Sequence, residues 1–212
     1  MSIGNHDMLT NDGSAYFDSF YLPTNDWVGT ENYYSFDYGH AHFVALDTLQ
    51  STLPASDQYR WLERDLSRTA QPWKFVFFHF PPYTAGFLDH QDGRRSPLDT
   101  ASVRRNVVPL FETYGVDVVF AGHSHSYERT FPILQNQVID QGQEPNYVNA
   151  AGPIYIVTGG GGASLLGLDS SPLNARQNLA HHMVEISLSG DQVIGRASTP
   201  SGFVIDEFTI ER

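Results

Sequence analysis

The chain has 212 residues, of which 41% are hydrophobic; this is enough for one domain with a sizeable core and excludes a disordered chain. Its formal net charge is -12 and Lys74 is its single lysine, so it lacks a basic stripe and we expect no nucleic-acid partner. No apolar run approaches the ~20 residues of a membrane span, and the absence of cysteine excludes disulfides and thiolate ligands.

The first third of the chain contains strand and helix signals. Residues 33–37 and 41–47 are rich in aromatic and β-branched side chains on either side of Gly39, a pattern typical of two strands with a tight connection. Ser56 is expected to cap a helix, because apolar residues recur after it at helical spacing with charged residues between them. This helix is predicted to lay one face on a sheet.

Two apolar runs in the middle of the chain predict buried strands. Residues 73–78 are apolar almost throughout and end at His79, as in a strand buried on both faces that leads into a functional loop. A helix is predicted to begin at Thr100 or Ser102, before a second buried strand at residues 116–121. The order of strand, helix and strand is typical of a parallel arrangement.

The last third of the chain is predicted to be mainly antiparallel. Residues 154–158 form an apolar run that ends in four glycines. Residues 184–188 alternate apolar with polar side chains, and residues 189–191 indicate a hairpin. Residues 135–151 are polar and poorly periodic, and we interpret them as an excursion over the surface.

Histidines follow both of the buried strands in the middle of the chain. His79 ends the first strand, and His123 and His125 follow the second. A lone histidine at a strand end is usually a hydrogen-bonded surface group, but imidazole is also the commonest neutral metal ligand. Residues 4–7 add an amide oxygen, an imidazole and a carboxylate within one turn. Together these side chains predict a metal site.

Three motifs carry a resemblance to a known family. Residues 4–7 (Gly-Asn-His-Asp), 76–79 and 122–125 (Gly-His-Ser-His) resemble, in order, the last three of five metal motifs in calcineurin-like metallophosphoesterases. Residues 127–129 (Tyr-Glu-Arg) look like the purple acid phosphatase branch. The resemblance implies an α/β fold, an αββα sandwich of two mixed sheets. It also implies that residues 1–212 are the C-terminal part of the family domain, without its first strand and helix units.

The resemblance implies hydrolysis of phosphoesters, of the acid phosphatase or phosphodiesterase type, by a metal-bound hydroxide on a two-metal centre. By that resemblance Asn5, His79 and His123 would bind one metal, and His125 would bind the other. The complete site would hold Fe, Zn or Mn ions, and the substrate would be a small phosphorylated molecule. The resemblance also suggests a secreted or periplasmic protein.

Three further residues receive roles from the same resemblance. His6 would contact phosphate and protonate the departing oxygen, and Asp7 is placed to orient and charge His6. His90 lies in the loop where purple acid phosphatases place histidines near the substrate. Arg94 and Arg95 of the same loop are better interpreted as solvated surface residues.

Two functional classes stay open because the family's first two motifs, which supply aspartates, would precede Gly4, where only three residues stand. The first class is a phosphoester hydrolase whose upstream segment lies outside this chain. The second is a truncated, catalytically inactive metal-binding remnant. For the isolated chain we expect one tightly bound metal at most and little or no phosphatase activity.

Other histidines and glycines in the chain form sequence patterns that look like functional motifs. Residues 39–42 (Gly-His-Ala-His) repeat the form of residues 122–125, but no buried apolar strand precedes them, so we predict a structural role. His181 and His182 begin an alternating strand, where an edge or rim position is the ordinary explanation. The glycine run at residues 159–162 lacks the lysine of a phosphate-binding loop, and we predict a tight turn that lets the backbone pass the active site closely.

Overall fold

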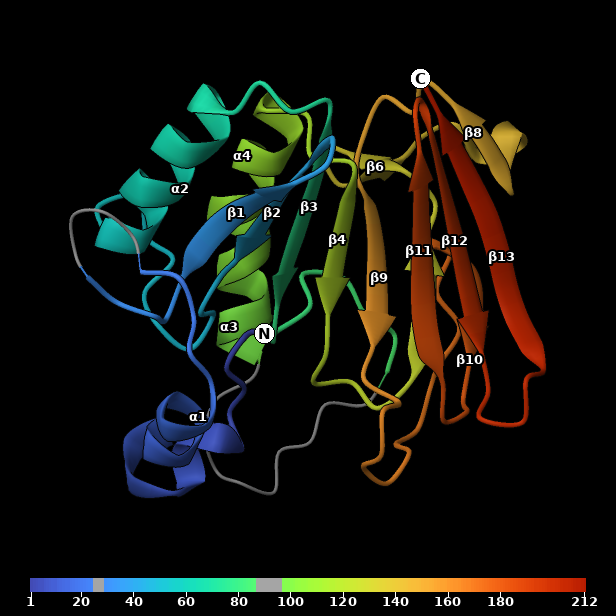
Figure 1. The fold of residues 1–212 in the computed structure, drawn as a ribbon. Helices are drawn as coiled ribbons and strands as arrows, with labels where there is room; N and C mark the ends of the chain where they lie inside the picture. The colour runs from blue at the N-terminus through green and yellow to red at the C-terminus, as the bar shows by residue number, and fades with distance from the viewer. Residues whose placement is uncertain (25–28, 87–96) are drawn as a thin grey trace. The chain divides into compact units, whose positions relative to one another are not determined.

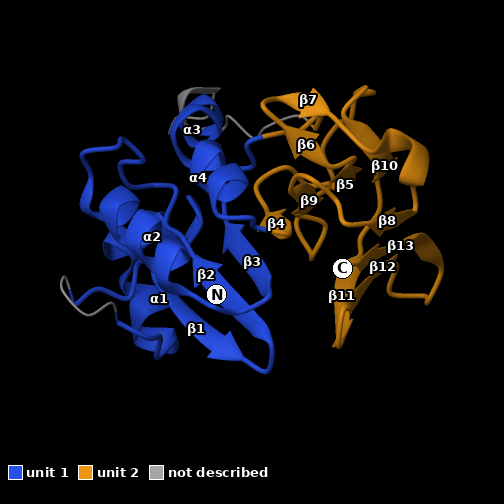
Figure 2. Cartoon of the chain, turned by 90° about the horizontal axis from the view of Figure 1, so that it is seen from above, with its two compact units in different colours: residues 1–82, 90–116 blue, residues 83–89, 117–212 orange. Residues whose placement is uncertain are grey.

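The computed structural model describes residues 1–24, 29–86 and 97–212 (Figure 1). The chain divides into two compact units, and Figure 2 distinguishes them by colour. Unit 1 comprises residues 1–82 and 90–116, and unit 2 comprises residues 83–89 and 117–212. Both units contain parallel as well as antiparallel strand pairs. The prediction of an α/β fold with mixed sheets is confirmed.

Unit 1 combines three strands with helices and short helical turns. In chain order these are η1 (Asp7–Leu9), η2 (Asn11–Gly13), α1 (Ser14–Ser19), β1 (Tyr34–Tyr38), β2 (Ala41–Ala45), α2 (Asp57–Arg68), β3 (Trp73–Phe78), α3 (Pro97–Ser102), η3 (Val103–Val107) and α4 (Val108–Thr113). β1 pairs with β2 in antiparallel fashion and β2 pairs with β3 in parallel fashion. α2 and α4 cover one face of these strands (Figure 2).

Helix α2 begins where the sequence predicts it. The Ser56 side chain accepts a hydrogen bond of 3.3 Å from the Tyr59 backbone N–H, which satisfies one of the free donors of the first turn. Trp61, Leu62 and Leu66 are buried on the face that meets the strands. The hydrophobic spacing and the cap together fix both the start of this helix and its orientation.

The helix before β4 is described from Pro97 onward, so it includes both predicted first residues, Thr100 and Ser102. The helix continues through a widened π turn, η3, in which the Val108 N–H donates to the Val103 carbonyl. In a regular α-helix the ring of Pro109 would clash with the carbonyl four residues earlier, and the wider turn relieves that clash.

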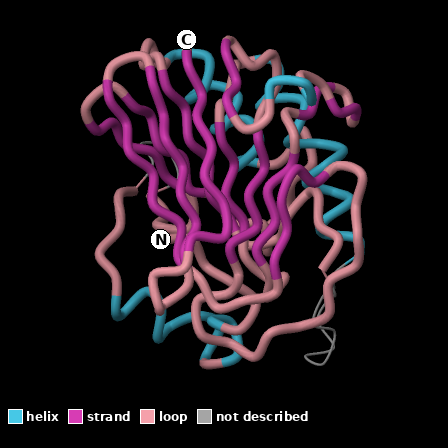
Figure 3. The backbone as a smooth tube through the Cα atoms, turned by 90° about the vertical axis from the view of Figure 1, so that its right-hand side faces the viewer, coloured by secondary structure: helices cyan, strands magenta, loops and turns pink. Residues whose placement is uncertain are grey.

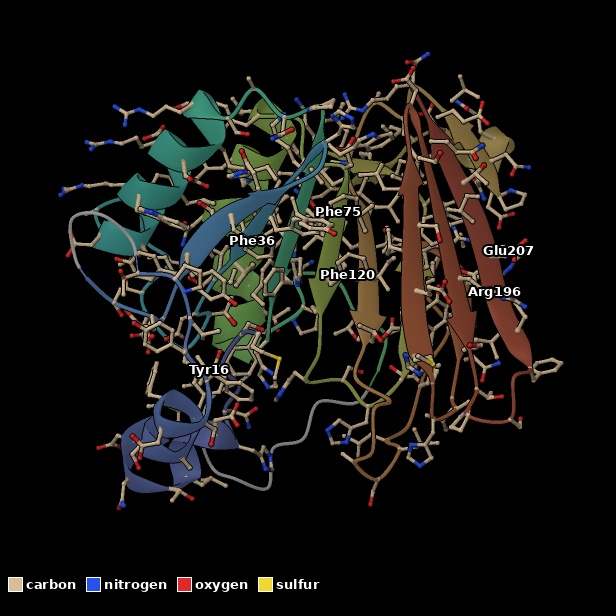
Figure 4. The ribbon with its side chains drawn as sticks, viewed as in Figure 1. Tyr16, Phe36, Phe75, Phe120, Arg196 and Glu207 are labelled. Carbon is tan, nitrogen blue, oxygen red and sulfur yellow. The ribbon has the colours of Figure 1, made fainter. Side chains whose placement is uncertain are left out.

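Aromatic side chains form a ladder on the strand face opposite α2. Phe43 stacks between Phe36 of β1 and Phe75 of β3, with ring centroids 5.1 and 5.2 Å apart (Figure 4). Ser35, the neighbour of Phe36, points the other way and donates a hydrogen bond to Asp65 of α2. Because side chains alternate between faces, a one-residue slip of β1 would exchange these environments. The ladder therefore helps to specify the register.

His42 is buried in β2 between two carboxylates. Its Nδ1 lies 2.6 Å from Asp37 Oδ1 in β1, and its Nε2 lies 2.8 Å from Asp65 Oδ2 in α2. Burial alone would lower the pKa of His42, but hydrogen bonds to Asp65 and Asp37 outweigh it and raise the pKa above its ordinary value. His42 thus joins two strands and a helix. The structural role predicted for the histidines of residues 39–42 is confirmed for His42.

We expect a His42→Gln variant to lose stability most strongly at low pH. A histidine with a raised pKa in the folded state contributes stability that is complete below its unfolded pKa, about 6.5, and is lost as the pH rises through the folded pKa. The difference in free energy of unfolding between the wild type and the variant should therefore be larger at about pH 6 than at about pH 9. Urea unfolding at both pH values measures it.

The exposed His40 provides the matched control, because a His40→Gln change removes an imidazole from the same turn without breaking the bonds of His42. A stability difference for His42→Gln that is constant or grows with pH would contradict the prediction.

Unit 2 is built mainly of strands. In chain order its elements are β4 (Val118–Ala121), β5 (Tyr127–Thr130), β6 (Ile133–Leu134), β7 (Gln137–Val138), η4 (Gln141–Gln143), β8 (Asn146–Val148), β9 (Ile154–Thr158), β10 (Asn174–Asn178), β11 (Met183–Ser189), β12 (Gln192–Ser198) and β13 (Val204–Glu211). β4, β9, β5 and β10 are neighbours in that order, and β11, β12, β13 and β8 form a second sheet. β6 and β7 form a small hairpin.

The second sheet confirms the predicted C-terminal hairpin. β11, β12 and β13 form an antiparallel meander that ends at the C-terminus (Figure 3). Gly190 adopts a φ of 58° in the turn between β11 and β12, a conformation that glycine accepts at low cost. Alternate side chains of β11 are exposed, as the sequence pattern predicts.

The interpretation of residues 135–151 as a surface excursion is wrong in part. They contain β8, which pairs in parallel with β13, and the Tyr147 side chain of β8 is completely buried. β8 has three residues, too few for a periodic signal, so the sequence does not reveal this strand. None of the helices in the described ranges is long and apolar enough to span a membrane.

A buried ion cluster connects the two sheets of unit 2. Arg129 of β5 is completely buried, and its Nε lies 2.6 Å from Asp206 Oδ2 in β13. Asp206 also accepts a hydrogen bond of 2.6 Å from the Tyr127 hydroxyl, and the Arg129 guanidinium donates to the Tyr147 hydroxyl and to Glu144. The Asp206 carboxylate is the largest of the favourable influences that raise the pKa of Arg129 despite its burial. The guanidinium therefore stays charged inside the unit.

Candidate metal centre

Asn5 and His79 come together in unit 1. Asn5 is buried in the turn after Ile3, and His79 follows the last residue of β3. Asn5 Oδ1 and His79 Nε2 are 2.5 Å apart. An amide oxygen and an imidazole nitrogen are both ligands for first-row metal ions, so this donor pair fits a metal site. Asn5 and His79, predicted from the motifs at residues 4–7 and 76–79, are thus neighbours in space.

The turn that carries Asn5 is held by its own polar groups. The Asp7 carboxylate accepts a hydrogen bond of 2.7 Å from the Gly4 N–H, and the Asp7 N–H donates to the Gly4 carbonyl. A Cβ on Gly4 would lie 2.8 Å from His79 Nδ1, so the close approach of the ring requires glycine here. His6 and Asp7 are exposed. Their roles in proton transfer and in orienting His6 stay predictions.

Buried polar groups support the loop that follows β3. The Phe80 N–H, next to His79, donates a hydrogen bond of 3.0 Å to the Thr48 hydroxyl. Burial raises the pKa of the neighbouring Asp47, although hydrogen bonds from Leu49, Asn32 and Gln50 oppose this. Residues 46–48 thus support the backbone next to His79. Their position directly after β2 is the signal in the sequence that points to this role.

His123 and His125 lie in a compact turn of unit 2. His123 is buried and adopts a positive φ of 64°, which is uncommon for a residue other than glycine. Backbone bonds from Ser124 to Gly122 and from Ser126 to Ser124 tighten the turn. His125 Nδ1 lies 2.7 Å from the Ser164 carbonyl, so Nδ1 carries the proton and a neutral ring presents Nε2 as a lone-pair donor. In this tautomer the ring could bind a metal ion through Nε2.

Gly86 and Gly159, both in unit 2, pack closely against the turn that carries His123 and His125. A Cβ on Gly86 would lie within bonding distance of the Ser124 hydroxyl, and a Cβ on Gly159 would lie 2.0 Å from the Ser124 carbonyl oxygen. Gly159 also donates its N–H to the Ser126 carbonyl at 3.3 Å. Within the glycine run, the close backbone approach to the turn that carries His123 and His125 is therefore made by Gly159.

The other candidates have separate outcomes. His90, Arg94 and Arg95 lie outside the described residues. His182 is buried and not at a rim; its Nδ1–H donates to the Ala180 carbonyl at 2.8 Å, and its Nε2 accepts from the Thr158 hydroxyl at 3.1 Å. Burial lowers the pKa of His182, and these two bonds suit the neutral ring.

The ligand predictions are divided between the two units. Asn5 and His79 belong to unit 1, whereas His123 and His125 belong to unit 2, so convergence of all four on one centre stays a prediction. Within the part of the chain that the structure describes, no group of three or more His, Asp or Glu side chains is close enough to hold an ion. Asn5 and His79 are in direct contact, at 2.5 Å.

Sequence reasoning did not give a role to Glu128. β5 consists of four buried residues, Tyr127 to Thr130, of which Glu128 is 1% exposed. Its carboxylate accepts hydrogen bonds from residues 84–86, from Ser126 and from Asn174. The available signal was a glutamate next to an arginine directly after the histidine turn, but spacing alone does not identify their partners.

The comparisons with known proteins agree with these motifs. The profile described as "Calcineurin-like phosphoesterase" matches residues 1–127. Acid phosphatase type 7 of Mus musculus is 35% identical over 181 residues, which cover 77% of this chain and 40% of that protein. The "probable inactive purple acid phosphatase 27" of Arabidopsis thaliana is 36% identical over 143 residues, covering 65% of this chain and 23% of that protein.

A solved structure gives the same result for the fold. The purple acid phosphatase from yellow lupin (Lupinus luteus) seeds matches with a TM-score of 0.84 and 28% identity, over 99% of this chain and 37% of that chain. The chain belongs to the calcineurin-like phosphoesterase family and is similar to its purple acid phosphatases. It spans less than half the length of each of these relatives.

Proposed function

We propose that this chain forms part of a metal-dependent phosphoester hydrolase in which Asn5, His79 and His123 bind one metal ion and His125 contributes to a second. The observation that carries this proposal is the 2.5 Å approach of Asn5 Oδ1 to His79 Nε2 after β3, in a chain of the calcineurin-like phosphoesterase family. The amide oxygen is only an acceptor, so His79 donates its Nε2–H to it in this structure. If that proton were displaced, the same oxygen and nitrogen would be available as ligands for a metal ion.

The remaining residues of the site act on the substrate and its protons. Bound metal ions supply the positive charge that attracts phosphate and make water a stronger nucleophile. Such local charge is needed because the chain carries a net charge of -12 and repels phosphate at long range. His6 is exposed next to Asn5, where its imidazole can donate a proton to the departing oxygen. Asp7 holds the turn that presents both residues.

The ligand count sets the expected stoichiometry. The first ion has three ligands in this chain, whereas the second has His125 alone, and one imidazole does not hold an ion tightly. We therefore expect the 212-residue chain to bind one metal ion and to show little or no turnover. Metal analysis after dialysis, combined with p-nitrophenyl phosphate turnover in Mn²⁺, Zn²⁺ or iron, measures both quantities.

A double variant tests the ligand assignment. Changing His79→Ala together with His123→Ala should weaken metal binding by more than about 100-fold, because even partners that only support a ligand are worth 10- to 100-fold. His40→Ala is the matched control, since His40 is an exposed histidine in a similar Gly-His-Ala-His sequence. Equal metal affinity of the double variant and the wild type would refute the assignment. Two ions per chain with rapid turnover would refute the stoichiometry.

The second candidate is a metal-binding protein without catalytic activity. The relative named "probable inactive" purple acid phosphatase 27 favours it, because that name denotes a member of the same family without expected activity. The coding sequence upstream of Gly4 discriminates between the candidates. An in-frame strand with an aspartate and a Gly-Asp motif would favour the hydrolase, and other upstream sequence would favour the inactive protein.

A further inference from the structure

Glu128 is the meeting point of five hydrogen-bond donors in unit 2. Its Oε1 accepts from the Thr84 hydroxyl at 2.5 Å, from the Gly86 N–H at 3.2 Å and from the Ser126 hydroxyl at 3.2 Å. Its Oε2 accepts from the Ala85 N–H at 2.7 Å and from the Asn174 side chain at 2.8 Å. A carboxylate has no hydrogen to donate and about four lone-pair sites, so five donors use its full capacity as an acceptor.

Four of the five donors belong to two loops that carry or adjoin residues of the proposed site. Thr84, Ala85 and Gly86 follow His79 by five to seven residues in the sequence. Ser126 closes the turn that carries His123 and His125, and its hydroxyl also lies 3.0 Å from the Ser124 hydroxyl. Glu128 therefore ties the loop after β3 to the turn after β4.

The packing of Gly86 makes this connection tight. Its N–H points at Glu128, and its α-carbon lies so close to Ser124 that no Cβ would fit between them. Ser124 stands between His123 and His125 and is completely buried. A shift of residues 84–86 would therefore be transmitted to Ser124, and through it to the backbone of both histidines.

We infer that Glu128 is a positioning residue that fixes the turn of residues 122–126 and so sets the geometry of His123 and His125 as metal ligands. This role rests on the proposed function, and it concerns a residue that does not itself touch the metal or the substrate. Glutamine has the same shape but would turn an NH₂ group toward donors, so it cannot replace the carboxylate. Aspartate keeps the charge but is one methylene shorter.

Glu128→Gln and Glu128→Asp in the 212-residue chain test the inference. Amide hydrogen exchange should become faster at Ala85, whose N–H donates to the carboxylate, and at Gly86, whose N–H would keep only the Thr84 hydroxyl as acceptor. The affinity for Co²⁺ should fall about 10- to 100-fold, the usual cost of losing a group that supports a ligand. The Co²⁺ absorption spectrum should also change, because it reports the geometry around the ion.

Tyr127→Phe is the matched control. Tyr127 is the neighbour of Glu128 on β5, equally buried, and its hydroxyl bonds Asp206 on the other side of the strand. This variant should lose stability but keep the Co²⁺ affinity, the spectrum and the exchange at Ala85 and Gly86. A general loss of stability alone would affect both variants alike.

The outcomes separate this inference from the proposed function. Wild-type affinity and spectrum in Glu128→Gln would overturn the positioning role and leave the ligand assignment intact. Unchanged exchange at Ala85 and Gly86 would also overturn it. A wild-type chain that binds no Co²⁺, Zn²⁺ or Mn²⁺ would overturn the proposed function together with the positioning role.

Discussion

Replacing Asp206 by alanine is expected to lower the free energy of unfolding by about 3–5 kcal/mol, the usual cost of removing one partner of a buried ion pair. Arg129 is completely buried, and Asp206 binds its Nε and Nη2 atoms at 2.6 and 3.1 Å. Without Asp206, the guanidinium would keep its charge inside the unit with Glu144 as its remaining ion-pair partner among the described residues. Urea unfolding followed by circular dichroism measures the loss.

An exposed ion pair on the adjacent strands is the control. Arg196 and Glu207 lie on β12 and β13 with 3.8 Å between Nε and Oε2, and both are labelled in Figure 4. About half of each side chain is exposed, so Glu207→Ala should cost no more than about 1 kcal/mol. Similar losses for the two variants would show that burial does not determine the energy of the Arg129 cluster.

Gly159→Ala is the second change with a large expected effect. The new Cβ would lie 2.0 Å from the Ser124 carbonyl oxygen, and a backbone atom of a buried residue cannot move aside as a flexible side chain can. We expect a loss of at least about 3 kcal/mol, the upper part of the range for overpacking. Metal affinity should fall as well, because Ser124 lies between His123 and His125. Thermal unfolding and metal titration measure the two effects.

Gly161 offers a control within the same glycine run. A Cβ on Gly161 would have no heavy atom within 4 Å, so Gly161→Ala should change the free energy of unfolding by about 0.5 kcal/mol or less. If Gly159→Ala proves equally neutral, the tight packing of the glycine run on the histidine turn is not needed for stability.

The parts of the fold that sequence predicts are those with local signals. The apolar run at residues 73–78 and the cap at Ser56 predict β3 and the start of α2, because burial on both faces and capping depend on neighbouring residues. The alternation in β11 likewise predicts its hairpin with β12. In each case the residues that form the element also contain the evidence for it.

The parts that sequence does not predict depend on distant partners. Tyr147 lies in a polar segment, yet it is buried because its strand pairs with β13 and its hydroxyl accepts a hydrogen bond from the Arg129 guanidinium. Glu128 is buried because five donors from three other segments meet it. Neither partner set can be read from spacing along the chain, since a buried polar group is stable only when the whole fold supplies its bonds.

The candidate site likewise has features that the sequence predicts and features that it does not. The sequence motifs correctly indicate that Asn5 and His79 lie together, because a parallel strand delivers His79 to the edge where functional loops gather. The motifs give no indication that Asp7 binds the Gly4 N–H or that His125 bonds the Ser164 carbonyl. These bonds involve backbone groups, which carry no residue-specific signal.

The widened turn at η3 has a consequence for how relatives of this chain differ in length. A π turn holds one residue more than an α turn, and here it accommodates Pro109. A relative without this proline could lose one residue between Val103 and Val107 and still keep α3 and α4 in regular geometry. Single-residue deletions in this family are therefore expected to fall in this turn, at a point where a sequence alignment alone would place no loop.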